Sequence, residues 1–566
     1  MQRPSDQNAP VALKVSEKSP AKAAHVNMMT DTIIANMPLE GLRTVLRGLL
    51  GVDPKVTLKL NALATEYLAA TRPATTPQFF TSGDLPTACP ALFDWQQRYR
   101  CLMGCGMGFE SMKLLTEVIH QFLALVWPEK MTTQESLMDL FTILDADVVQ
   151  SVTAVQKELL TVTGTREMTG EEVTIVHSLL DGLVASKKQA EQVGQQFLFE
   201  RGLLRMQKME GMPTVTSSQQ VLQSIITPGY IQEARPNIIE HVKLGRSLVP
   251  RMFMGLWQFS SPAWGTATVS QINKHFRKHV DAGFTAYDMA DHYGDAEVTF
   301  GQFRSSQPDA ANIFCATKYC VFEPVTITVE VVKASITERL VSINADVIDL
   351  LQLHWQSYED KQYIRMTQLV EQDARVLNVG LCNFDTQRMN EILESGIHIV
   401  SNQVQFSLID LRPTFKMADS CRKHEVKLLT YGSLCGGFLA DKWLNKPAPN
   451  MYGADMTPSH RKYYEMITIW GGWTLLQRLL TTLFSIGEKY NVSISNVATR
   501  WVLDHDYVAA TIIGARMGIS EHVEENIKGF SFRLYEEDRA AIQVVLDQSR
   551  SADVFEAMGD CGAEYR

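Results

Sequence analysis

Four acidic residues and one tyrosine lie close together in the segment AYDMADHYGDAEVTFG, residues 286–301: Asp288, Asp291, Tyr293, Asp295 and Glu297. Carboxylates at this density are typical of three kinds of site, namely a metal site, a solvated acidic turn, or one half of a proton relay. The residues that follow along the chain help to decide between the three.

An ionisable residue stands at the end of three successive apolar, β-rich runs. Asp288 follows FTAY, Lys318 follows IFCAT and His354 follows VIDLLQL, while Tyr293 comes five positions after Asp288. A solvated rim accounts for most single charges at strand ends, but it accounts poorly for three in succession with a tyrosine nearby. We therefore interpret these four residues as one site.

Together the four side chains have the chemistry that carbonyl reduction requires. A ketone or aldehyde that accepts hydride becomes an alkoxide and needs a proton, which a tyrosine can supply if a neighbouring ammonium lowers its pKa. We expect Tyr293 to be the general acid, Lys318 to lower its pKa, and Asp288 to hold Lys318 in place. His354 would donate a hydrogen bond to the substrate carbonyl and orient it.

The elements that must position these residues form a repeating pattern after residue 237. Eight short apolar runs alternate with amphipathic helices, which predicts an α/β fold, a parallel (β/α)8 TIM barrel with its chemistry at the C-terminal ends of the strands. The alternative is an open doubly wound sheet, but GLWQFSSPAWG after the first run is not the glycine fingerprint of that fold. The eight runs are RMFMGLW, FTAYD, IFCATK, VIDLLQLH, VLNVGLC, IVSNQVQF, VKLLTYG and VAATIIG.

Apolar residues at three- and four-residue spacing predict a separate all-helical domain before the barrel. Two of its helices begin with capping-box pairs, Thr132 with Glu135 and Thr169 with Glu172. The predicted organisation is a flexible polar tail (1–30), an all-helical domain (31–210), a linker (211–236), a barrel (237–550) and a C-terminal tail (551–566).

Three segments, YDMADHYGDAE, ATKY and DLLQLHW, resemble in order and spacing the tetrad segments of the aldo-keto reductase superfamily. The resemblance extends over roughly residues 237–535 and includes HVKLGRSLVPRMFMG, which is similar to the hairpin that closes the bottom of the family's barrel. Because such a barrel aims only Asp288 and Tyr293 inward, we expect no metal in the acidic segment. Asp291 and Asp295 are then expected to be turn residues, and Glu297 to open the next helix.

The resemblance also implies a nicotinamide cofactor. Asn383 in GLCNFD and Gln403 in SNQVQFSLID match the residues that hold the nicotinamide carboxamide, and Tyr431 matches the aromatic residue that stacks on the nicotinamide ring. Arg516 matches the basic position that faces the adenosine phosphate, and Asn526 matches a residue near the adenine.

The end of the last run supports an anion site independently of the resemblance, because Gly514, Arg516 and a following helix N-terminus combine there. His522 stands where many NADPH-dependent members of the family have an arginine. Arg516 is therefore the residue left with a permanent positive charge to bind the 2′-phosphate. We expect NADPH, with NADH as the alternative. In this family the end of the first strand also lines the substrate pocket, and that position is Trp257.

Bulk composition narrows the function classes further. A net charge of −10 and a pI near 5.8 argue against a dedicated nucleic-acid binder or a basic membrane-surface protein. No apolar run approaches the roughly 20 residues that a bilayer span needs. Nine cysteines without a framework spacing indicate a reducing compartment, so we expect a cytoplasmic protein with no nucleic-acid, membrane or metal partner.

These observations predict an NAD(P)H-dependent oxidoreductase that acts on a small carbonyl compound or, in reverse, on an alcohol or sugar hemiacetal. The alternative is a binding or regulatory protein built on the same barrel, like the potassium-channel β subunits. In that case the function would lie in the helical domain, which would bind an unknown protein partner. Because the tetrad and the cofactor residues all follow residue 250, we expect the barrel to fold and bind cofactor without the helical domain.

Overall fold

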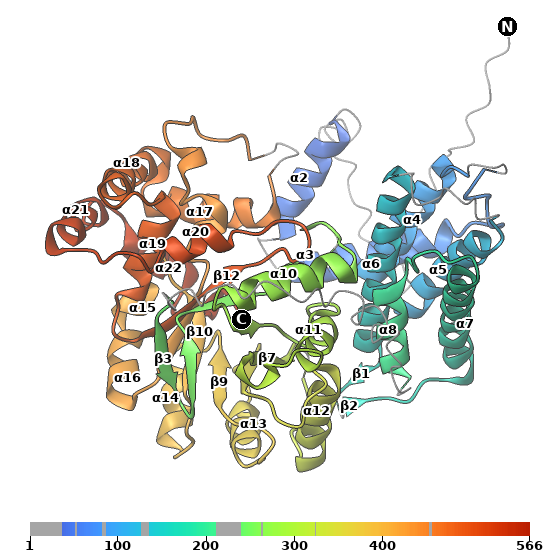
Figure 1. Ribbon diagram of the computed structural model, residues 1–566, viewed down its shortest axis with the longest axis horizontal. Coiled ribbons are helices and arrows are strands. Elements are labelled where there is room, and N and C mark those ends of the chain that lie inside the picture. The colour runs from blue at the N-terminus through green and yellow to red at the C-terminus, as the bar shows by residue number, and fades with distance from the viewer. Residues whose placement is uncertain are drawn as a thin grey trace, which may run out of the picture.

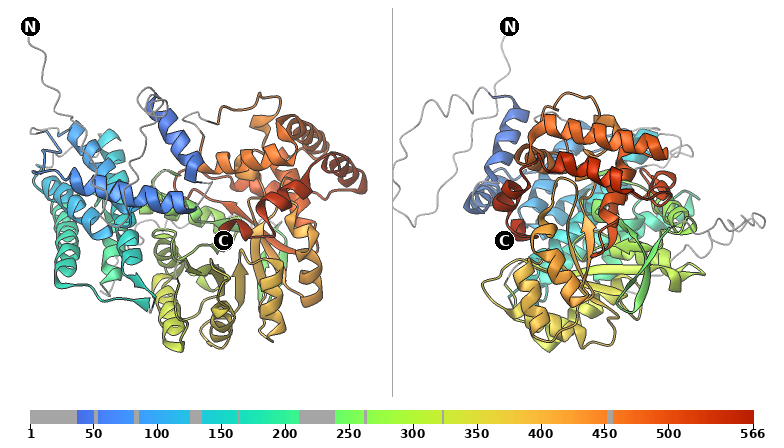
Figure 2. Two further views of the ribbon diagram at one scale, coloured as in Figure 1. Left: turned by 180° about the vertical axis from the view of Figure 1, so that it is seen from behind. Right: turned by 90° about the vertical axis from the view of Figure 1, so that its left-hand side faces the viewer.

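The computed structural model of the chain describes residues 37–50, 54–81, 86–125, 135–162, 164–210, 239–261, 264–322, 324–451 and 456–566. A helical region lies beside an eight-stranded barrel in all three views of Figures 1 and 2. The predicted polar tail and linker lie outside the described residues. Among the helices of the described part, none combines the length and the apolarity that crossing a membrane requires.

The helical region has an aromatic core. Phe122 packs edge-on against Phe141 and Phe199, with ring centroids 4.7 and 5.2 Å apart. Its helices are α2 (Leu39–Leu50), α3 (Pro54–Ala70), α4 (Pro90–Gly104), α5 (Gly108–Leu123), α6 (Glu135–Glu158), α7 (Gly170–Gln192) and α8 (Glu200–Met209). The capping box at the start of α7 is confirmed, since Thr169 accepts a hydrogen bond from the backbone N–H of Glu172. Thr132 lies outside the described residues.

The N-terminal region is helical, as predicted, and also contains one short hairpin. A short antiparallel hairpin, β1 (Leu160–Thr161) and β2 (Gly164–Thr165), joins α6 to α7. The segment LTVTGT is rich in β-branched residues, which favour an extended backbone over a helix.

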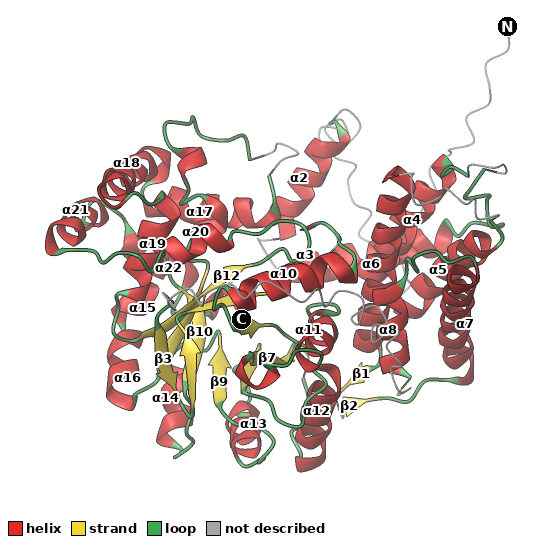
Figure 3. Ribbon diagram, in the orientation of Figure 1, coloured by secondary structure: helices red, strands yellow, loops and turns green. Residues whose placement is uncertain are grey.

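The barrel is a closed sheet in the order β10-β11-β12-β5-β6-β7-β8-β9. All eight predicted runs form its strands, shown in yellow in Figure 3, and every neighbouring pair is parallel. Their bounds are β5 (Met252–Gly255), β6 (Ala286–Asp288), β7 (Phe314–Val321), β8 (Leu350–Trp355), β9 (Val379–Cys382), β10 (Ser401–Gln405), β11 (Lys427–Tyr431) and β12 (Val508–Gly514).

A hairpin precedes the barrel, as the sequence predicted. Strands β3 (His241–Leu244) and β4 (Ser247–Pro250) pair antiparallel. In the turn between them, the N–H of Arg246 donates to Asn378 Oδ1 at 2.9 Å. Asn378 directly precedes β9, so the hairpin lies at the N-terminal ends of the strands and closes the bottom of the barrel.

Helices cover the outside of the barrel. The first of them, α10, begins with a capping box between Thr268 and Gln271 and buries one face that includes Ile272, Phe276 and Val280. The helices are α10 (Val269–Asp281), α11 (Ala296–Ser305), α12 (Val329–Ser342), α13 (Gln362–Glu371), α14 (Thr386–Glu394), α15 (Arg412–Phe415), α16 (Met417–His424), α17 (Pro458–Trp470), α18 (Gly472–Tyr490), α19 (Ile494–Leu503), α20 (Val523–Lys528), α21 (Glu536–Leu546) and α22 (Ser551–Met558). Short 3₁₀ turns are η2 (Trp257–Ser260), η4 (Ala310–Asn312), η5 (Cys435–Gly437), η6 (Asp441–Trp443) and η7 (Ala563–Tyr565).

Residues 551–566, which the sequence analysis set apart as a tail, are a structured part of the barrel. They form α22 and η7, and the N–H of Arg550 just before α22 donates to Trp470 O at 2.7 Å. The chain end, marked C, projects over the strands of the barrel in Figure 1 and lies at the edge of the molecule in the right view of Figure 2.

The helical region contacts the barrel directly. In Figure 1, α8 lies next to α11 and α12. Lys208 Nζ at the end of α8 donates to the carbonyls of Val341 and Ser342 at 2.7 and 2.8 Å, and Val162 O accepts from the N–H of Thr326 at 2.8 Å. The two regions therefore pack against each other, and the folding and cofactor binding of the barrel by itself stay a prediction.

Candidate active site

Asp288, Lys318 and Tyr293 come together at the C-terminal end of the barrel. Lys318 Nζ lies 2.7 Å from Asp288 Oδ2 and also donates to Met289 O at 2.9 Å. The same nitrogen lies 4.9 Å from the centroid of the Tyr293 ring. His354 lies on the neighbouring strand β8, two residues past Gln352, which pairs with Lys318 across the ladder, so Gln352 and His354 lie on the same side of the strand.

Burial dominates the proton affinity of Tyr293. It raises the pKa of the Tyr293 hydroxyl, while the ammonium of Lys318 acts in the opposite direction by favouring phenolate. Lys318 therefore lowers the pKa of Tyr293, as predicted, but the opposite effect of burial on this pKa is larger. Burial lowers the pKa of Lys318, but the charge of Asp288 together with Tyr293 and Cys382 outweighs burial, so the net direction is upward. At neutral pH the tyrosine carries its proton and the lysine its charge.

Two glutamines hold the second oxygen of Asp288. Gln352 Nε2 and Gln403 Nε2 donate to Asp288 Oδ1 at 2.8 and 2.7 Å, and Gln403 Nε2 also donates to Gln352 Oε1 at 2.8 Å. The sequence analysis missed Gln352, although alternation along a strand puts it on the same side as His354 two residues later. The family resemblance implies that Gln403 holds the nicotinamide carboxamide. In the structure its side-chain amide nitrogen donates a hydrogen bond to the Asp288 carboxylate.

His354 is neutral and its tautomer follows from one hydrogen bond. Its Nδ1 lies 3.2 Å from the carbonyl oxygen of Cys382, and because a carbonyl only accepts, Nδ1 carries the proton and Nε2 is an acceptor. Burial, together with the nearby Arg566 guanidinium, lowers the pKa of His354 to about 4. In this tautomer His354 can accept the hydroxyl hydrogen of an alcohol. Donation to a carbonyl, the role expected from the sequence, requires the proton on Nε2.

The other acids of residues 286–301 are each paired with a partner far along the chain. Asp291 Oδ2 forms an ion pair with Arg339 and accepts from the N–H of Cys320 at 3.0 Å. Asp295 is buried against Arg201 of α8, with hydrogen bonds of 2.6 and 2.7 Å. Asp291 and Asp295 do lie in turns, as the sequence predicts, and each also forms an ion pair with a distant arginine.

Glu297 does open a helix, since it lies in the first turn of α11, as predicted. It is also buried and accepts a hydrogen bond from Thr317 Oγ1 on β7. Burial raises the pKa of Glu297 to about 7. The sequence gives no sign of this, because burial depends on how α11 packs against the strand.

Asp291, His292 and Cys320 place one potential ligand atom each within 4.8 Å of one another. Asp291 already faces the guanidinium of Arg339, and a cation at this position would meet that charge at close range. We therefore assign no metal to this group.

Residues 559–566 lie over the part of the barrel mouth where the resemblance places the nicotinamide. Tyr431 at the end of β11 donates from its hydroxyl to Asn383 Oδ1 at 3.0 Å, and its hydroxyl also lies 3.0 Å from that of Tyr565. The Tyr565 ring stands edge-on to His354, with ring centroids 5.8 Å apart. The sequence does not indicate Tyr565 as a site residue, because no motif near it distinguishes this segment from an ordinary C-terminal tail.

Several contacts hold this segment in place. Arg412, itself paired with Asp410, donates two hydrogen bonds to the Glu564 carboxylate at 2.8 and 2.9 Å. The Arg566 guanidinium lies over the Tyr358 ring, 4.3 Å from its centroid. Gly562 has φ +80°, and a Cβ there would lie 2.1 Å from Asn383 O, so only glycine fits against the backbone at this point.

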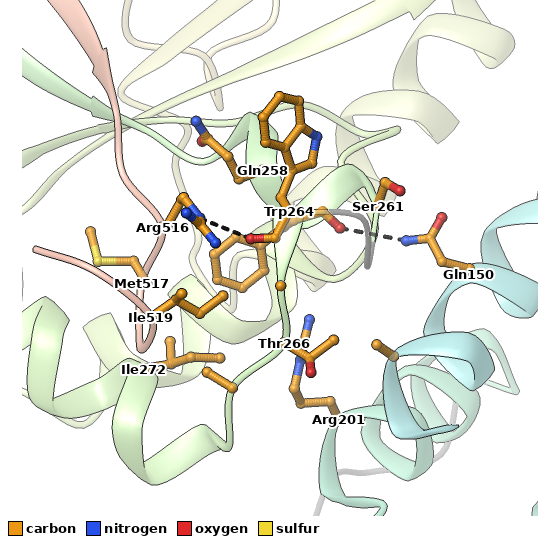
Figure 4. Close-up of a pocket in the computed structure, with 14 residues that line it drawn as sticks. Gln150, Arg201, Gln258, Ser261, Trp264, Thr266, Ile272, Arg516, Met517 and Ile519 are labelled. Carbon is orange, nitrogen blue, oxygen red and sulfur yellow. Dashed lines mark hydrogen bonds between the residues drawn. The ribbon is translucent and has the colours of Figure 1, made fainter. Parts of the chain in front are cut away.

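The predicted phosphate end of the site borders the helical region. Gly514 ends β12, Arg516 is exposed just beyond it, and Asn526 lies half-buried on α20. Arg516 Nε donates to Trp264 O at 2.8 Å, and both residues line a pocket to which α6 and α8 contribute Gln150 and Arg201 (Figure 4).

Trp257 lies in η2 directly after β5, at the rim of the barrel. Its side chain packs against Trp264 with ring centroids 5.1 Å apart, and 42% of the residue is exposed. The ring is therefore accessible from solvent, and its contact with substrate stays a prediction.

Residues 251–547 match the model of the aldo/keto reductase family, and the chain belongs to that family. Flagellar radial spoke protein 5 of Chlamydomonas reinhardtii is 29% identical over 136 residues, which cover 24% of this chain and 26% of that protein, so the chain spans about a quarter of this relative's length. An aldo-keto reductase of Strobilurus tenacellus is 24% identical over 54% of this chain and 92% of its own length.

The NADH-specific methylglyoxal reductase of Escherichia coli is 22% identical over 51% of this chain and 92% of its own length. Among solved structures, the glycerol dehydrogenase of Gluconobacter oxydans is similar with a TM-score of 0.45 and 20% identity, covering 56% of this chain and 97% of that one.

Proposed function

We propose that this protein is a nicotinamide-dependent oxidoreductase that reduces a small aldehyde or ketone, with Tyr293 as the general acid. The observation that carries the proposal is the buried arrangement of Lys318 between the Asp288 carboxylate and the Tyr293 ring. Family membership supports an oxidoreductase that acts on carbonyl compounds. Relatives named for methylglyoxal and glyoxal reduction support a small substrate.

The residues at the barrel mouth fit a nicotinamide cofactor. The Asn383 amide and the Tyr431 ring adjoin each other there, and the exposed Arg516 lies at the end of β12 with the following helix α20. Asn383 and Gln403 would hold the carboxamide, Tyr431 would pack on the ring, and Gly514, Arg516 and Asn526 would hold the adenosine end. When bound, the cofactor supplies or accepts hydride.

The chain's own residues handle the proton. Tyr293 donates it to the carbonyl oxygen as negative charge develops there. The Lys318 ammonium stabilises the phenolate that remains, and Asp288, fixed by Gln352 and Gln403, keeps Lys318 charged and in place. His354 contacts the same oxygen, as a donor to the carbonyl with its proton on Nε2 or as an acceptor from the alcohol in the observed tautomer.

The test is a steady-state assay of Tyr293→Phe with NADPH or NADH and a panel of small aldehydes and ketones. We expect turnover to fall by about a hundredfold to ten-thousandfold, because the general acid is lost, while cofactor binding stays nearly unchanged. Tyr319→Phe is the matched control, since Tyr319 is a largely buried tyrosine on the same strand as Lys318 and packs against Arg339. Turnover of Tyr293→Phe close to that of the unmodified protein would disprove the assignment.

A second candidate is a cofactor-sensing binding protein with little turnover. It is favoured by residues 559–566, which lie on Tyr431 and Asn383, and by the similarity to a protein named for the flagellar radial spoke. The same assay separates the two candidates. Tight cofactor binding with negligible turnover across the panel supports the second, and turnover that depends on Tyr293 supports the first.

A further inference from the structure

Helix α8 of the helical region contacts the turn that carries Tyr293. Arg201 in its first turn donates from Nε to Asp295 Oδ2 at 2.7 Å and from a terminal nitrogen to Asp295 Oδ1 at 2.6 Å. Both side chains are buried. A two-bond pair of this kind fixes orientation as well as distance, because the planar guanidinium matches the carboxylate.

Asp295 is connected to Tyr293 through one tight turn. The N–H of Tyr293 donates to Ala290 O at 3.1 Å, and the N–H of Ala296 donates to Tyr293 O at 3.1 Å. Between Tyr293 and Asp295, Gly294 has φ +60°, and a Cβ there would lie 2.6 Å from Phe259 O. The backbone at this point is thus packed too closely for another residue, and a displacement of Asp295 must carry Tyr293 with it.

Further residues of the helical region hold Arg201 and its surroundings. Asp145 on α6 accepts from the N–H of Gly202 at 2.7 Å, next to Arg201 in the chain. The Arg201 guanidinium lies 5.4 Å from the centroid of the Phe259 ring, and Gln150 on α6 donates to Phe259 O at 3.5 Å. Figure 4 shows Gln150 and Arg201 reaching the barrel from the helical side.

We propose that Arg201 is a positioning residue for carbonyl reduction. Through Asp295 it holds the turn that places Tyr293 against Lys318, so that the helical region is a working part of the reductase. This inference rests on the proposed function, in which Tyr293 is the general acid. A reacting group displaced by about 1 Å can lose about a hundredfold in rate, which is the scale of effect that a loosened turn would have.

The first experiment compares Arg201→Gln and Arg201→Lys in the full chain. We expect Arg201→Gln to lower kcat about 10- to 100-fold while KM and cofactor affinity change by less than about threefold, since ground-state contacts are kept. Arg201→Lys should recover part of kcat, because it restores the charge but not the two-bond geometry. Asp295→Asn should act like Arg201→Gln, and the double variant should be no worse than either single one.

Lys208→Met is the matched control. Lys208 lies at the other end of α8 and donates to the carbonyls of Val341 and Ser342, so its loss loosens the contact between the two regions without removing the Arg201–Asp295 pair. We expect it to leave kcat unchanged. An equal fall of kcat in Lys208→Met and Arg201→Gln would overturn the proposal, because it would reduce Arg201 to a general interface contact.

A second readout does not depend on activity. Amide hydrogen exchange over residues 289–299 should become faster in Arg201→Gln and stay unchanged in Lys208→Met. Unchanged exchange there in a folded Arg201→Gln protein would overturn the proposal. If the unmodified protein has no turnover but exchange responds as expected, the proposed function fails while the placement of the turn by Arg201 stands.

Discussion

Asp288 lies at the centre of the hydrogen bonds in the candidate site. It accepts hydrogen bonds from Lys318, Gln352 and Gln403, and these come from three different strands. Burial lowers the pKa of Lys318, and the carboxylate of Asp288 raises it. The carboxylate therefore favours a charged lysine beside Tyr293.

Arg516 is expected to contact the 2′-phosphate, which NADPH carries and NADH lacks. Arg516→Ala should weaken NADPH binding about 10- to 100-fold, because a charged contact of this kind contributes roughly 1.5–3 kcal/mol. NADH binding should change little. Fluorescence titration with each cofactor measures both affinities, and equal weakening of both would show that Arg516 does not contact this phosphate.

Glu297 predicts a pH dependence of stability. Its pKa is about 7 in the folded protein, against an ordinary value of 4.5. Between these two values the folded state holds a proton that the unfolded state releases, so Glu297 makes the unfolding free energy fall as the pH rises from about 4.5 to 7. Glu297→Gln mimics the protonated form, and at pH 8 it should be more stable than the unmodified protein by about 3 kcal/mol at most.

Urea unfolding of both proteins at pH 4.5 and pH 8 tests this prediction. The exposed Glu537 on α21 provides the control, since Glu537→Gln should give the same difference between the two pH values as the unmodified protein. If Glu297→Gln is no more stable than the unmodified protein at pH 8, then ionisation of the Glu297 carboxyl does not destabilise the folded state.

At the scale of elements, the segment of residues 559–566 lies across the contacts that a nicotinamide would use. Tyr565 shares a hydrogen bond with Tyr431, which also bonds Asn383. We expect a cofactor that binds beside Tyr431 and Asn383 to compete with Tyr565 for the Tyr431 hydroxyl, and a neutral hydrogen bond of this kind contributes about 0.5–1.5 kcal/mol. The segment is therefore expected to weaken cofactor binding.

Removal of residues 559–566, or Tyr565→Ala alone, should tighten cofactor binding by about two- to tenfold. Tyr535→Ala is the control, because Tyr535 is an exposed tyrosine at the start of α21. Cofactor titration of the three variants measures the effect. Weaker binding in both of the first two variants would mean that the segment forms part of the cofactor site.

At the scale of the whole molecule, the contact between the helical region and the barrel changes what a truncated chain should do. Residues 237–566 retain every strand of the barrel and its closing hairpin, but they lack Arg201, Gln150 and the rest of α6 and α8. The turn that carries Tyr293 would face solvent where the helical region now covers it. We expect this fragment to bind cofactor yet to lose about 10-fold or more in kcat relative to the full chain.

Steady-state kinetics and cofactor titration on the fragment and the full chain test this expectation, with the full-length Arg201→Gln variant measured beside them. A fragment with the kcat of the full chain would support the independence inferred from the sequence. A fragment that folds but binds no cofactor would extend the role of the helical region to the pocket shared by Arg516 and Gln150.

The order of the eight strands, Asp288 at the end of β6 and His354 near the end of β8 follow from the sequence alone, whereas Lys318, expected at a strand end, lies within β7. They depend on short-range properties: apolar β-rich runs, alternation along a strand, and turns or caps within a few residues. The tertiary structure decides the remaining features. Arg201 and Asp295 are 94 residues apart, and Tyr431 and Tyr565 are 134 apart, so no local pattern links either pair. Burial of Glu297 and His354, which sets their pKa values, likewise depends on what packs against them and not on their neighbours in the chain.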